Sequence, residues 1–330
     1  MMKVFVYPTE GKGSVLLNPY INNLKEVLAK HYELIEPLYK LKLPMILIFF
    51  LNSFKANIYV LNWIENSAAG KSGFWGAILS LLGLQIIKLR GGEVVWIFHN
   101  IHPHEGETYW TLKLKKYLFR NATMIIAHSK EAYNYAKQYA SCSVCLKNHP
   151  IKKEDYGFWD GKTVECDFFY WGTILPYKGI VEFLSNPLCR ETKRKILIMG
   201  KCKEDSLFLK IQSLLTDNVR FENRSADFCE IAAQCKKSKY VIFPYIGNSI
   251  SSSGILMDTL QMGGVPVGPN RGAFADLAER GCCITYNNID EVFLLPVDKK
   301  NCKILDKNQV KAFVDENSWE SFGTWFHTTI

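Results

Sequence analysis

Short apolar runs alternate with segments of helical spacing along the first 150 residues of the chain. The runs are rich in Val, Ile, Phe and Tyr, which is typical of strands buried in a parallel sheet. They predict strands over residues 3–7, 57–63, 93–98 and 123–127. Helices are predicted between them, over residues 19–31, 72–87, 108–120 and 130–139. Strands that are separated by helices favour a parallel, doubly wound sheet.

The second half of the chain repeats this alternation. Strands are predicted over residues 166–170, 195–199, 218–221, 240–243 and 265–267, and helices over 179–184, 206–215, 226–235 and 254–262. A polar stretch near residues 146–161 joins the two halves. Ligands of doubly wound folds bind at the carboxyl ends of the strands. The pattern therefore predicts an α/β protein of two Rossmann-like lobes that face a central cleft.

Composition agrees with a folded protein of two domains. The 330 residues are 48% hydrophobic and 22% charged, which excludes a disordered or collagen-like chain. Among ten cysteines, Cys142 and Cys145 form the one C-x-x-C, so reduced thiols are expected rather than a zinc site. The apolar stretches 43–54 and 72–87 are too short or too polar to span a membrane. Without a recognisable signal peptide, a cytosolic protein is expected.

The net charge of +8 is unevenly distributed along the chain. Residues 1–150 hold 17 Lys and Arg, 9 Glu and no Asp, whereas residues 151–330 hold 23 basic and 23 acidic residues. All the excess positive charge thus belongs to the first half. Such a basic half predicts an anionic partner, either nucleic acid or the anionic face of a membrane.

The loop after the predicted strand 93–98 carries three histidines and a glutamate: His99, His102, His104 and Glu105. Its position at a strand's carboxyl end favours a polar loop that positions a hydroxylated ligand or moves a proton. A metal site and simple capping of the next helix are the alternatives.

The strand ends of the second half combine glycine with cations and hydroxyls. Gly172 and Lys178 follow one strand, Gly200-Lys201 follows the next, and the run 249–254 (SISSSG) leads into a helix. Free N–H groups at a helix start, with lysines nearby, are suited to a diphosphate.

Several of these segments resemble motifs of GT-B-fold glycosyltransferases, in particular bacterial enzymes that build exopolysaccharide or capsule. Segment 171–179 (WGTILPYKG) is similar to the family's Gly-x-x-x-x-Tyr-Lys-Gly element of the donor lobe. Ser253-Gly254 and segment 264–267 (GVPV) resemble its serine–glycine helix start and Gly-x-Pro-Val strand. Loop 99–105 is similar to its His-Asn-x-x-Pro-His-Glu loop, segment 62–65 (NWIE) resembles its His-Trp-Pro-Glu strand end with two departures, and His149-Pro150 resembles its linker start.

The resemblance implies a GT-B fold with an acceptor-binding domain over residues 1–148 and a nucleotide-sugar donor domain over 149–318. A C-terminal helix, 319–330, would cross back onto the first domain. The implied activity is a metal-independent hexosyl transfer from a nucleoside diphosphate sugar, UDP or GDP, to a hydroxyl of a lipid-linked saccharide. It would serve bacterial surface polysaccharide biosynthesis, with no tightly bound cofactor and no nucleic-acid partner.

The same resemblance places the protein in the cytoplasm, peripherally on the inner face of the cell membrane. The basic first domain would contact anionic lipid there. Lys113, Lys115, Lys116 and Arg120 lie among apolar residues in a segment that could rest on such a surface. An ordinary solvated helix face is the alternative.

The resemblance also implies site residues. The donor-binding positions are Gly172, Lys178, Gly200, Lys201, Arg224, Tyr245, Ser252, Ser253, Gly254 and Asp258. The acceptor-binding positions are Gly11, Gly13, Asn18, Trp63, Glu65 and Asn100, and the catalytic candidates are Glu105, His104 and His99. An inverting mechanism needs a base, for which Glu105 and His104 come first and Glu10 and Glu65 are reserves. A retaining mechanism needs no such base, and His99 or His104 would then bind the donor sugar.

One departure from the family pattern and one missing motif bear on donor binding. Many retaining members carry two glutamates eight residues apart, whereas the corresponding positions here hold Ser251 and Thr259, with Asp258 one residue out of register. No D-x-D triplet occurs, which agrees with neutralisation of the diphosphate by lysines and a helix start.

Three functions other than glycosyl transfer also agree with parts of the sequence. A nucleotide-sugar epimerase of the same fold would use the same donor lobe. Segment 69–72 (AGKS) mimics a P-loop of a nucleotide-binding protein, although Glu65 stands where that motif requires glycine. A nonenzymatic nucleic-acid binder would suit the basic half, but no RNA-binding signature accompanies it.

Overall fold

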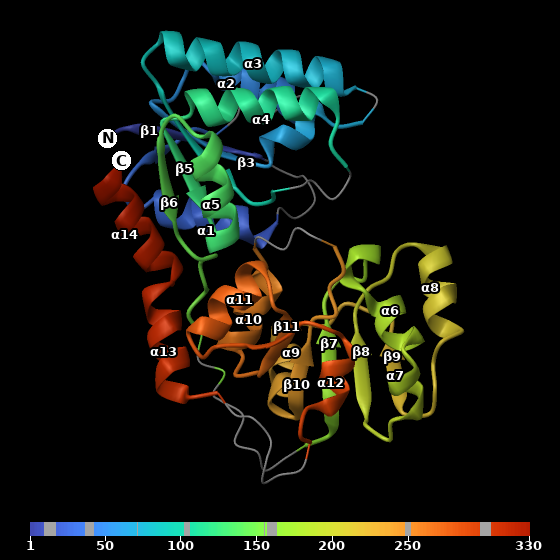
Figure 1. Ribbon diagram of the computed structural model, residues 1–330. Coiled ribbons are helices and arrows are strands. Elements are labelled where there is room, and N and C mark those ends of the chain that lie inside the picture. The colour runs from blue at the N-terminus through green and yellow to red at the C-terminus, as the bar shows by residue number, and fades with distance from the viewer. Residues whose placement is uncertain are drawn as a thin grey trace. The chain divides into compact units, whose positions relative to one another are not determined.

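The computed structural model describes residues 1–9, 18–36, 43–70, 72–101, 106–154, 156, 164–247, 252–297 and 305–330. The chain forms two compact units (Figure 1). Unit 1 comprises Met1–Pro150 with Trp319–Ile330, and unit 2 comprises Ile151–Ser318. Each unit is built on its own six-stranded sheet, in which all strand pairs are parallel.

The sheet of unit 1 has the order β2-β1-β3-β4-β5-β6. Its strands are β1 (Lys3–Tyr7), β2 (Glu33–Leu34), β3 (Ile58–Asn62), β4 (Glu93–Phe98), β5 (Met124–Ala127) and β6 (Ser143–Leu146). Val4 and Val6 face one side of the sheet, whereas Phe5 and Tyr7 face the other, because side chains alternate along a strand. The register pairs Phe98 with Ala127, so the residues that follow these two strand ends are neighbours.

Helices cover both faces of this sheet. One face carries α1 (Pro19–Leu28) and α14 (Trp319–Thr329), so the last helix of the chain completes the first core. The other face carries η1 (Ile64–Ala68), α2 (Met45–Asn52), α3 (Gly73–Leu89), α4 (Tyr109–Asn121) and α5 (Lys130–Tyr139). Within this second layer α2 packs on α3, α3 on α4, and α4 on α5.

The sheet of unit 2 has the order β12-β11-β10-β7-β8-β9. Its strands are β7 (Cys166–Trp171), β8 (Ile196–Met199), β9 (Val219–Glu222), β10 (Ser238–Ile242), β11 (Pro266–Pro269) and β12 (Ile284–Tyr286). Its helices are η2 (Pro176–Lys178), α6 (Ile180–Ser185), α7 (Pro187–Glu191), α8 (Asp205–Gln212), α9 (Phe228–Lys236), α10 (Gly254–Gln261), α11 (Gly272–Glu279), α12 (Asp290–Leu294) and α13 (Lys307–Glu316).

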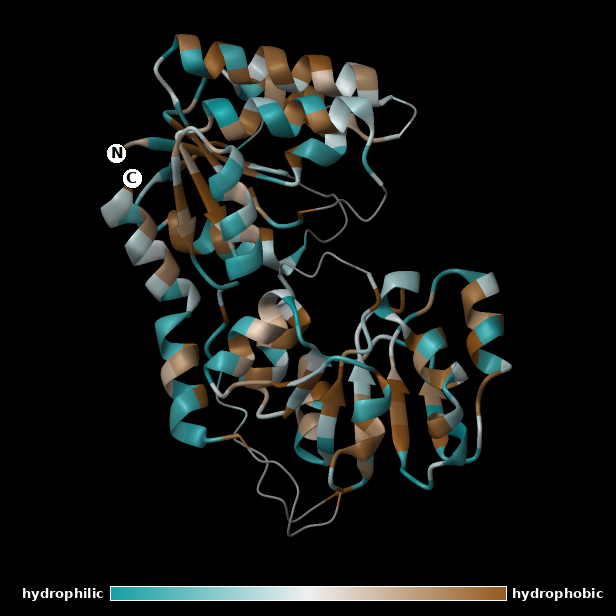
Figure 2. Ribbon diagram, viewed as in Figure 1, coloured by the Kyte–Doolittle hydropathy of each residue, from teal (hydrophilic) through white to brown (hydrophobic). Residues whose placement is uncertain are grey.

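The predicted fold class is confirmed, since both halves are doubly wound parallel sheets. In Figure 2 the strands of each unit are largely brown, in keeping with the apolar runs that predicted them. The short edge strands β2, β6 and β12 were not predicted, because a strand with one neighbour is only partly buried and lacks a continuous apolar run. No described helix is long and apolar enough to span a bilayer.

Candidate functional site

A buried lysine lies at the carboxyl end of the second sheet, just after β7. Lys178 is 6% exposed, and its ammonium donates a hydrogen bond to the Tyr245 hydroxyl and lies 4.0 Å from the centre of the Tyr245 ring. No carboxylate among the described residues forms an ion pair with it. Burial therefore lowers the pKa of Lys178 to about 7. A buried amine that lacks a counter-ion is typical of a site for an anion.

Close packing of two loops holds this lysine in place. Because β7 and β10 are neighbours in the sheet, the segments that follow them meet. Gly179 has a φ of +69°, and a Cβ at this position would lie 1.9 Å from the Pro244 carbonyl oxygen, so only glycine fits. The Ile246 N–H also donates to the Tyr177 carbonyl at 3.0 Å.

The N-terminus of α10 meets the same tyrosine. Ser253 caps this helix by accepting the Leu256 N–H at 3.3 Å, and it lies close enough to Tyr245 to oppose the rise that burial causes in the pKa of that phenol. The Tyr245 hydroxyl thus contacts Lys178 and lies near Ser253. The lysine ammonium, the serine hydroxyl and the free N–H groups at the helix start, including that of Gly254, are therefore within reach of one diphosphate-sized anion. Ser252, next to this cap, is half-buried.

The predicted glycines at the strand ends allow two backbones to approach each other. A Cβ on Gly200 would lie 2.0 Å from the Gly172 carbonyl oxygen, and Gly172 itself has a φ of +108°. Lys201 follows at the end of β8, where its side chain is exposed and has no partner among the described residues. It is thus available to a ligand above this edge of the sheet.

Two other predicted donor residues face carboxylates instead. Arg224 forms ion pairs with Glu222, at 2.6 Å, and with Glu230, which raise the pKa of its guanidinium. Burial raises the pKa of Asp258 to about 7, and the negative charge of Glu154 adds to this effect. No described contact brings either residue to Lys178, so their donor-binding role stays a prediction.

Thr259 occupies the second of the two positions where many retaining enzymes carry glutamate. Its side chain is fully buried, accepts the Trp171 indole N–H at 3.0 Å and donates to the Ile255 carbonyl at 2.8 Å. It therefore serves the packing of α10 on β7. Ser251, at the first of these positions, lies outside the described residues.

Tyr20 and three histidines form a buried cluster at the carboxyl end of the first sheet. His99 follows β4, His128 follows β5, and His149 lies beyond β6. The Tyr20 ring centre lies 4.9 Å from those of His99 and His149, and its hydroxyl is 2.9 Å from Nε2 of His128. The Trp63 ring stacks on His99 with 4.2 Å between centres.

Hydrogen bonds define which nitrogens of these rings carry protons. Nδ1 of His128 lies 2.6 Å from the Lys147 carbonyl and must donate to it, so Nε2 accepts the Tyr20 hydroxyl proton. The amide of Asn62 donates to the Tyr7 carbonyl, which turns Oδ1 of Asn62 toward Nε2 of His99 at 3.0 Å. His99 therefore donates through Nε2 and keeps Nδ1 as an acceptor, with no partner among the described residues.

Burial keeps all three imidazoles neutral. It lowers the pKa of His99 well below its usual value, that of His128 to about 3 and that of His149 to about 4, and mutual repulsion between the rings adds to the effect in His99 and His128. A neutral imidazole can accept a hydrogen bond from a hydroxyl group but is a weak proton acceptor. No group of three or more His, Cys, Asp or Glu in the described residues is placed to hold a metal ion.

The predicted acceptor residues have different environments. Asn18 caps α1 by accepting the Tyr20 N–H at 3.1 Å, and Trp63 stacks on His99 as described. Glu65, in η1, is buried with Oε2 3.3 Å from the Trp96 indole nitrogen, and Asn100 is half-buried. The remaining predicted residues lie outside the described part of the chain: Glu10, Gly11, Gly13, His104 and Glu105.

Sequence analysis did not assign His128 or Tyr20 to this site, and it assigned His149 only to the linker. The available signal was positional. His99 and His128 each come directly after a buried strand, as "FH" and "AH", and adjacent parallel strands bring such residues together. Tyr20 gave no such signal, because it lies within an amphipathic helix and is indistinguishable there from a core residue.

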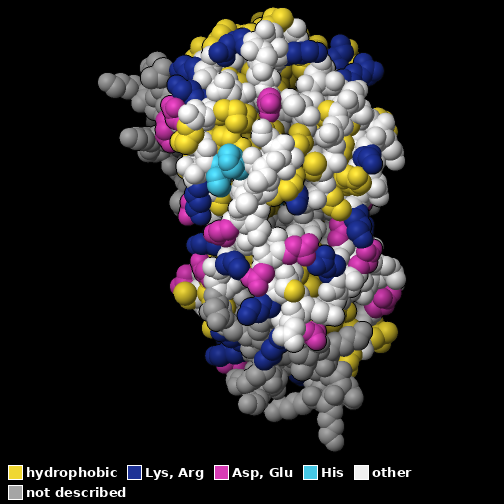
Figure 3. Space-filling view, turned by 90° about the vertical axis from the view of Figure 1, so that its left-hand side faces the viewer, with side chains coloured by type: hydrophobic (Ala, Val, Ile, Leu, Met, Phe, Trp, Pro, Cys, Tyr) yellow, Lys and Arg dark blue, Asp and Glu magenta, His cyan; other side chains and the backbone are white. Residues whose placement is uncertain are grey.

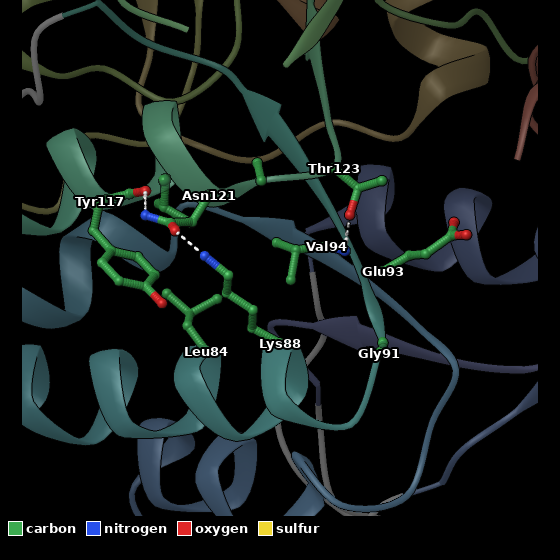
Figure 4. Close-up of a pocket in the computed structure, with 11 residues that line it drawn as sticks. Leu84, Lys88, Gly91, Glu93, Val94, Tyr117, Asn121 and Thr123 are labelled. Atoms are coloured by element: carbon green, nitrogen blue, oxygen red, sulfur yellow. Dashed lines mark hydrogen bonds between the residues drawn. The ribbon is translucent and has the colours of Figure 1, made fainter. Parts of the chain in front are cut away.

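A cavity of about 300 Å³ lies at the opposite, amino end of β4 (Figure 4). Lys88 donates to Asn121 at 2.8 Å across it, and the Val94 N–H donates to Thr123 at 3.0 Å. Its polar groups thus bind one another, and it is separated from His99 by the length of the strand.

The lysine–tyrosine–serine site and the histidine cluster each occupy the carboxyl edge of a doubly wound sheet. Two such units in one chain are the GT-B fold. HepE from Anabaena, in a structure with UDP and glucose, matches this protein with a TM-score of 0.68 at 12% identity, over 100% of this chain and 99% of HepE. The match to HepE with UDP-glucose has a TM-score of 0.67 at 13% identity, over 100% of both chains.

Other solved structures share this fold. AviGT4, a glycosyltransferase involved in avilamycin A biosynthesis, matches with a TM-score of 0.60 at 12% identity, over 100% of this chain and 97% of AviGT4. A UDP-forming trehalose-phosphate synthase from Burkholderia xenovorans matches with a TM-score of 0.65 at 9% identity, over 99% of both chains. No protein-family model and no curated protein sequence matches the chain.

Proposed function

We propose that the protein is a glycosyltransferase that moves a sugar from a nucleoside diphosphate donor to an acceptor hydroxyl. The observation that carries this proposal is the buried Lys178, which pairs with no carboxylate among the described residues and lies beside Tyr245 and the N-terminus of α10. These groups supply a cation, a hydroxyl and backbone N–H donors for a leaving diphosphate, so departure of the nucleotide needs no metal ion. HepE, which shares the fold, binds UDP-glucose, which favours UDP over GDP.

Unit 1 supplies the acceptor side in this proposal. Nδ1 of His99 accepts a hydrogen bond from a sugar hydroxyl, and Trp63 and Asn100 bind the acceptor near it. Glu105 is the first candidate for the base of an inverting transfer. A hexose is the proposed donor sugar, and a lipid-linked saccharide of bacterial surface polysaccharide synthesis, at the inner face of the membrane, is the proposed acceptor.

Nucleotide binding tests the donor site. UDP and UDP-sugars are expected to raise the unfolding temperature, because they bind the folded chain alone. Lys178→Met should weaken UDP binding about 10- to 100-fold, the usual effect of losing a hydrogen-bonded charge. Lys203→Met, which alters an exposed lysine of the same unit, is the matched control. Unchanged UDP affinity in Lys178→Met would remove the diphosphate site from the proposal.

Product analysis tests the chemistry. Glu105→Gln should abolish transfer while UDP affinity stays intact, and Glu131→Gln, an exposed residue of α5, should change neither. A released epimer of the donor sugar, in place of a glycosylated acceptor, would show an epimerase instead. Activity that survives in excess EDTA is expected, and its loss would contradict metal-independent transfer.

A further inference from the structure

Helix α3 exposes several large apolar side chains, and apart from Leu84 and Ile87 the residues that it buries are small. Its buried residues include Gly73, Gly76, Ala77, Ser80 and Gly83. Trp75, Leu82 and Leu89 are seven residues apart, hence on one stripe, and are 65%, 50% and 77% exposed. A helix that lies against a protein core in water normally shows the opposite distribution. The exposed stripe therefore indicates a surface that another phase or molecule covers.

The neighbouring helices extend this surface. Helix α2 is apolar all round, although only Phe49 and Asn52 of it are buried. Because α2 packs on α3 and α3 on α4, their exposed side chains join into one area, which we call the apolar face. It consists of Met45, Leu51, Phe54, Phe74, Trp75, Leu82, Leu89, Tyr109 and Leu112, each at least 42% exposed.

Cations accompany the three helices of the apolar face. Helices α2, α3 and α4 contain no Asp or Glu. Their exposed cations and those next to them, which we call the basic rim, are Lys55, Lys88, Arg90, Lys113, Lys116 and Arg120. None of the six forms an ion pair within the described residues. Figure 3 shows one side of unit 1, where dark blue cations and yellow apolar side chains appear together with a few magenta carboxylates.

One lysine of the predicted basic segment does not belong to this rim. Lys115 is buried, donates to the Ile101 carbonyl at 2.6 Å and pairs with Glu107 at 2.8 Å. Lys116 and Arg120, one helical turn apart, line a groove of about 740 Å³ between α4 and α5, to which Lys115 also contributes. Phe119, Tyr135 and Tyr139 form its aromatic walls, so the groove has cations and rings for a phosphate headgroup.

We propose that unit 1 binds an anionic lipid bilayer through the apolar face and the basic rim. The apolar side chains enter the boundary between headgroups and acyl chains, and the rim contacts lipid phosphates. Charge complementarity selects this occupant, since three neighbouring helices that between them carry cations and no carboxylates suit an anionic partner. The inference deepens the proposed function, on which it rests for the lipid-linked acceptor that such a bilayer would present.

Sedimentation of the full chain with vesicles tests the surface. The chain should bind vesicles of 70% phosphatidylcholine and 30% phosphatidylglycerol more tightly than vesicles of phosphatidylcholine alone, and less tightly as salt rises. Trp75→Ser with Leu82→Ser should lower the partition coefficient about tenfold or more. Lys116→Glu with Arg120→Glu should lower it about tenfold or more on anionic vesicles and little on neutral ones. Leu209→Ser with Lys210→Glu, an exposed pair on α8 of unit 2, should have no effect.

Three results would overturn the inference. The first is no vesicle binding, and the second is equal binding to neutral and anionic vesicles. The third is a dimer in solution that Trp75→Ser with Leu82→Ser dissociates, because the apolar face would then be an interface between copies of the chain. UDP-induced stabilisation, measured on the same samples, separates this inference from the proposed function. Vesicle binding without UDP binding would reject the proposed function and keep the docking surface. UDP binding without vesicle binding would reject the docking surface and keep the proposed function. If Trp75→Ser with Leu82→Ser fails to fold, Lys116→Glu with Arg120→Glu tests the inference in its place.

Discussion

Nucleotide binding should depend on pH because Lys178 gains or loses a proton near neutral pH. Burial lowers its pKa to about 7, whereas the unfolded chain holds this proton up to about pH 10.4. Between these values the unfolded chain binds more protons at this residue, so its contribution to the free energy of unfolding rises with pH. A bound diphosphate favours the ammonium and raises its pKa again. UDP binding at pH 8 should therefore take up a proton, and affinity should fall as pH rises above 7.

Calorimetric titration of UDP in two buffers with different ionisation enthalpies measures this uptake. Lys178→Met should abolish it. Proton release at pH 8, or uptake that persists in Lys178→Met, would contradict the assignment.

Glu65 is a buried carboxyl whose removal should stabilise the protein at neutral pH. Burial raises its pKa, and only the distant charge of Lys115, the Trp96 N–H and its own backbone N–H oppose this shift. As pH rises from about 4.3, the unfolded chain loses this proton before the folded chain does, and stability falls. Glu65→Gln keeps an acceptor for Trp96 without the charge. It should therefore unfold at a higher temperature than the wild type at pH 7 and at a similar one at pH 4.

Glu131→Gln, on the exposed face of α5, is the control and should behave as the wild type at both pH values. A Glu65→Gln protein that is less stable than the wild type at pH 7 would show that the charge of Glu65 is needed. Glu65 would then return as a candidate base.

At the level of elements, the packing of α3 on η1 depends on a missing side chain. A Cβ at Gly76 would lie 1.8 Å from the Ser67 carbonyl oxygen, and the backbone of η1 cannot yield without losing its hydrogen bonds. A Cβ at Gly83 would lie 2.7 Å from the Phe49 ring, which supplies its nearest atoms and can turn aside. Although alanine favours helix more than glycine, Gly76→Ala should destabilise unit 1 by about 2–4 kcal/mol, and Gly83→Ala by less. Urea unfolding of both variants checks this order.

Apolar runs and helical spacing predicted the central elements of both sheets with boundaries correct to a few residues. The reason is physical, because a strand with two neighbours is buried on both faces and must be apolar throughout. Strand β4, predicted and found over the same six residues, is an example. Edge strand β6 (SVCL) is only half-buried and gave no comparable signal.

The candidate site was predictable where local sequence determines local geometry. The glycine–lysine turn after β7 and the serine cap of α10 could be read in this way, and the structure brings both to Tyr245. The link of His128 to Tyr20 could not, because it joins residues 108 positions apart whose proximity depends on the packing of α1. The buried orientation of Lys115 likewise depends on Glu107 and the Ile101 carbonyl, which spacing along the chain does not show.

At the scale of the whole molecule, the last residues of the chain belong to the core of its first half. Phe326 of α14 is fully buried against unit 1, with its ring 6.0 Å from that of Tyr32. Because each unit has its own sheet and core, calorimetry should resolve two unfolding transitions. Phe326→Ala should destabilise unit 1 by about 3–5 kcal/mol and lower its transition alone. Thr324→Ala, on the exposed side of the same helix, should leave both transitions in place.

UDP identifies which transition belongs to which unit, since it should raise only that of unit 2, where Lys178 and Ser253 lie. In Phe326→Ala with UDP present, the transition of unit 1 should therefore move down and that of unit 2 up. A single transition that Phe326→Ala lowers and UDP raises would show instead that the two cores unfold as one cooperative body. The C-terminal helix would then stabilise the nucleotide site as well as the sheet that it covers.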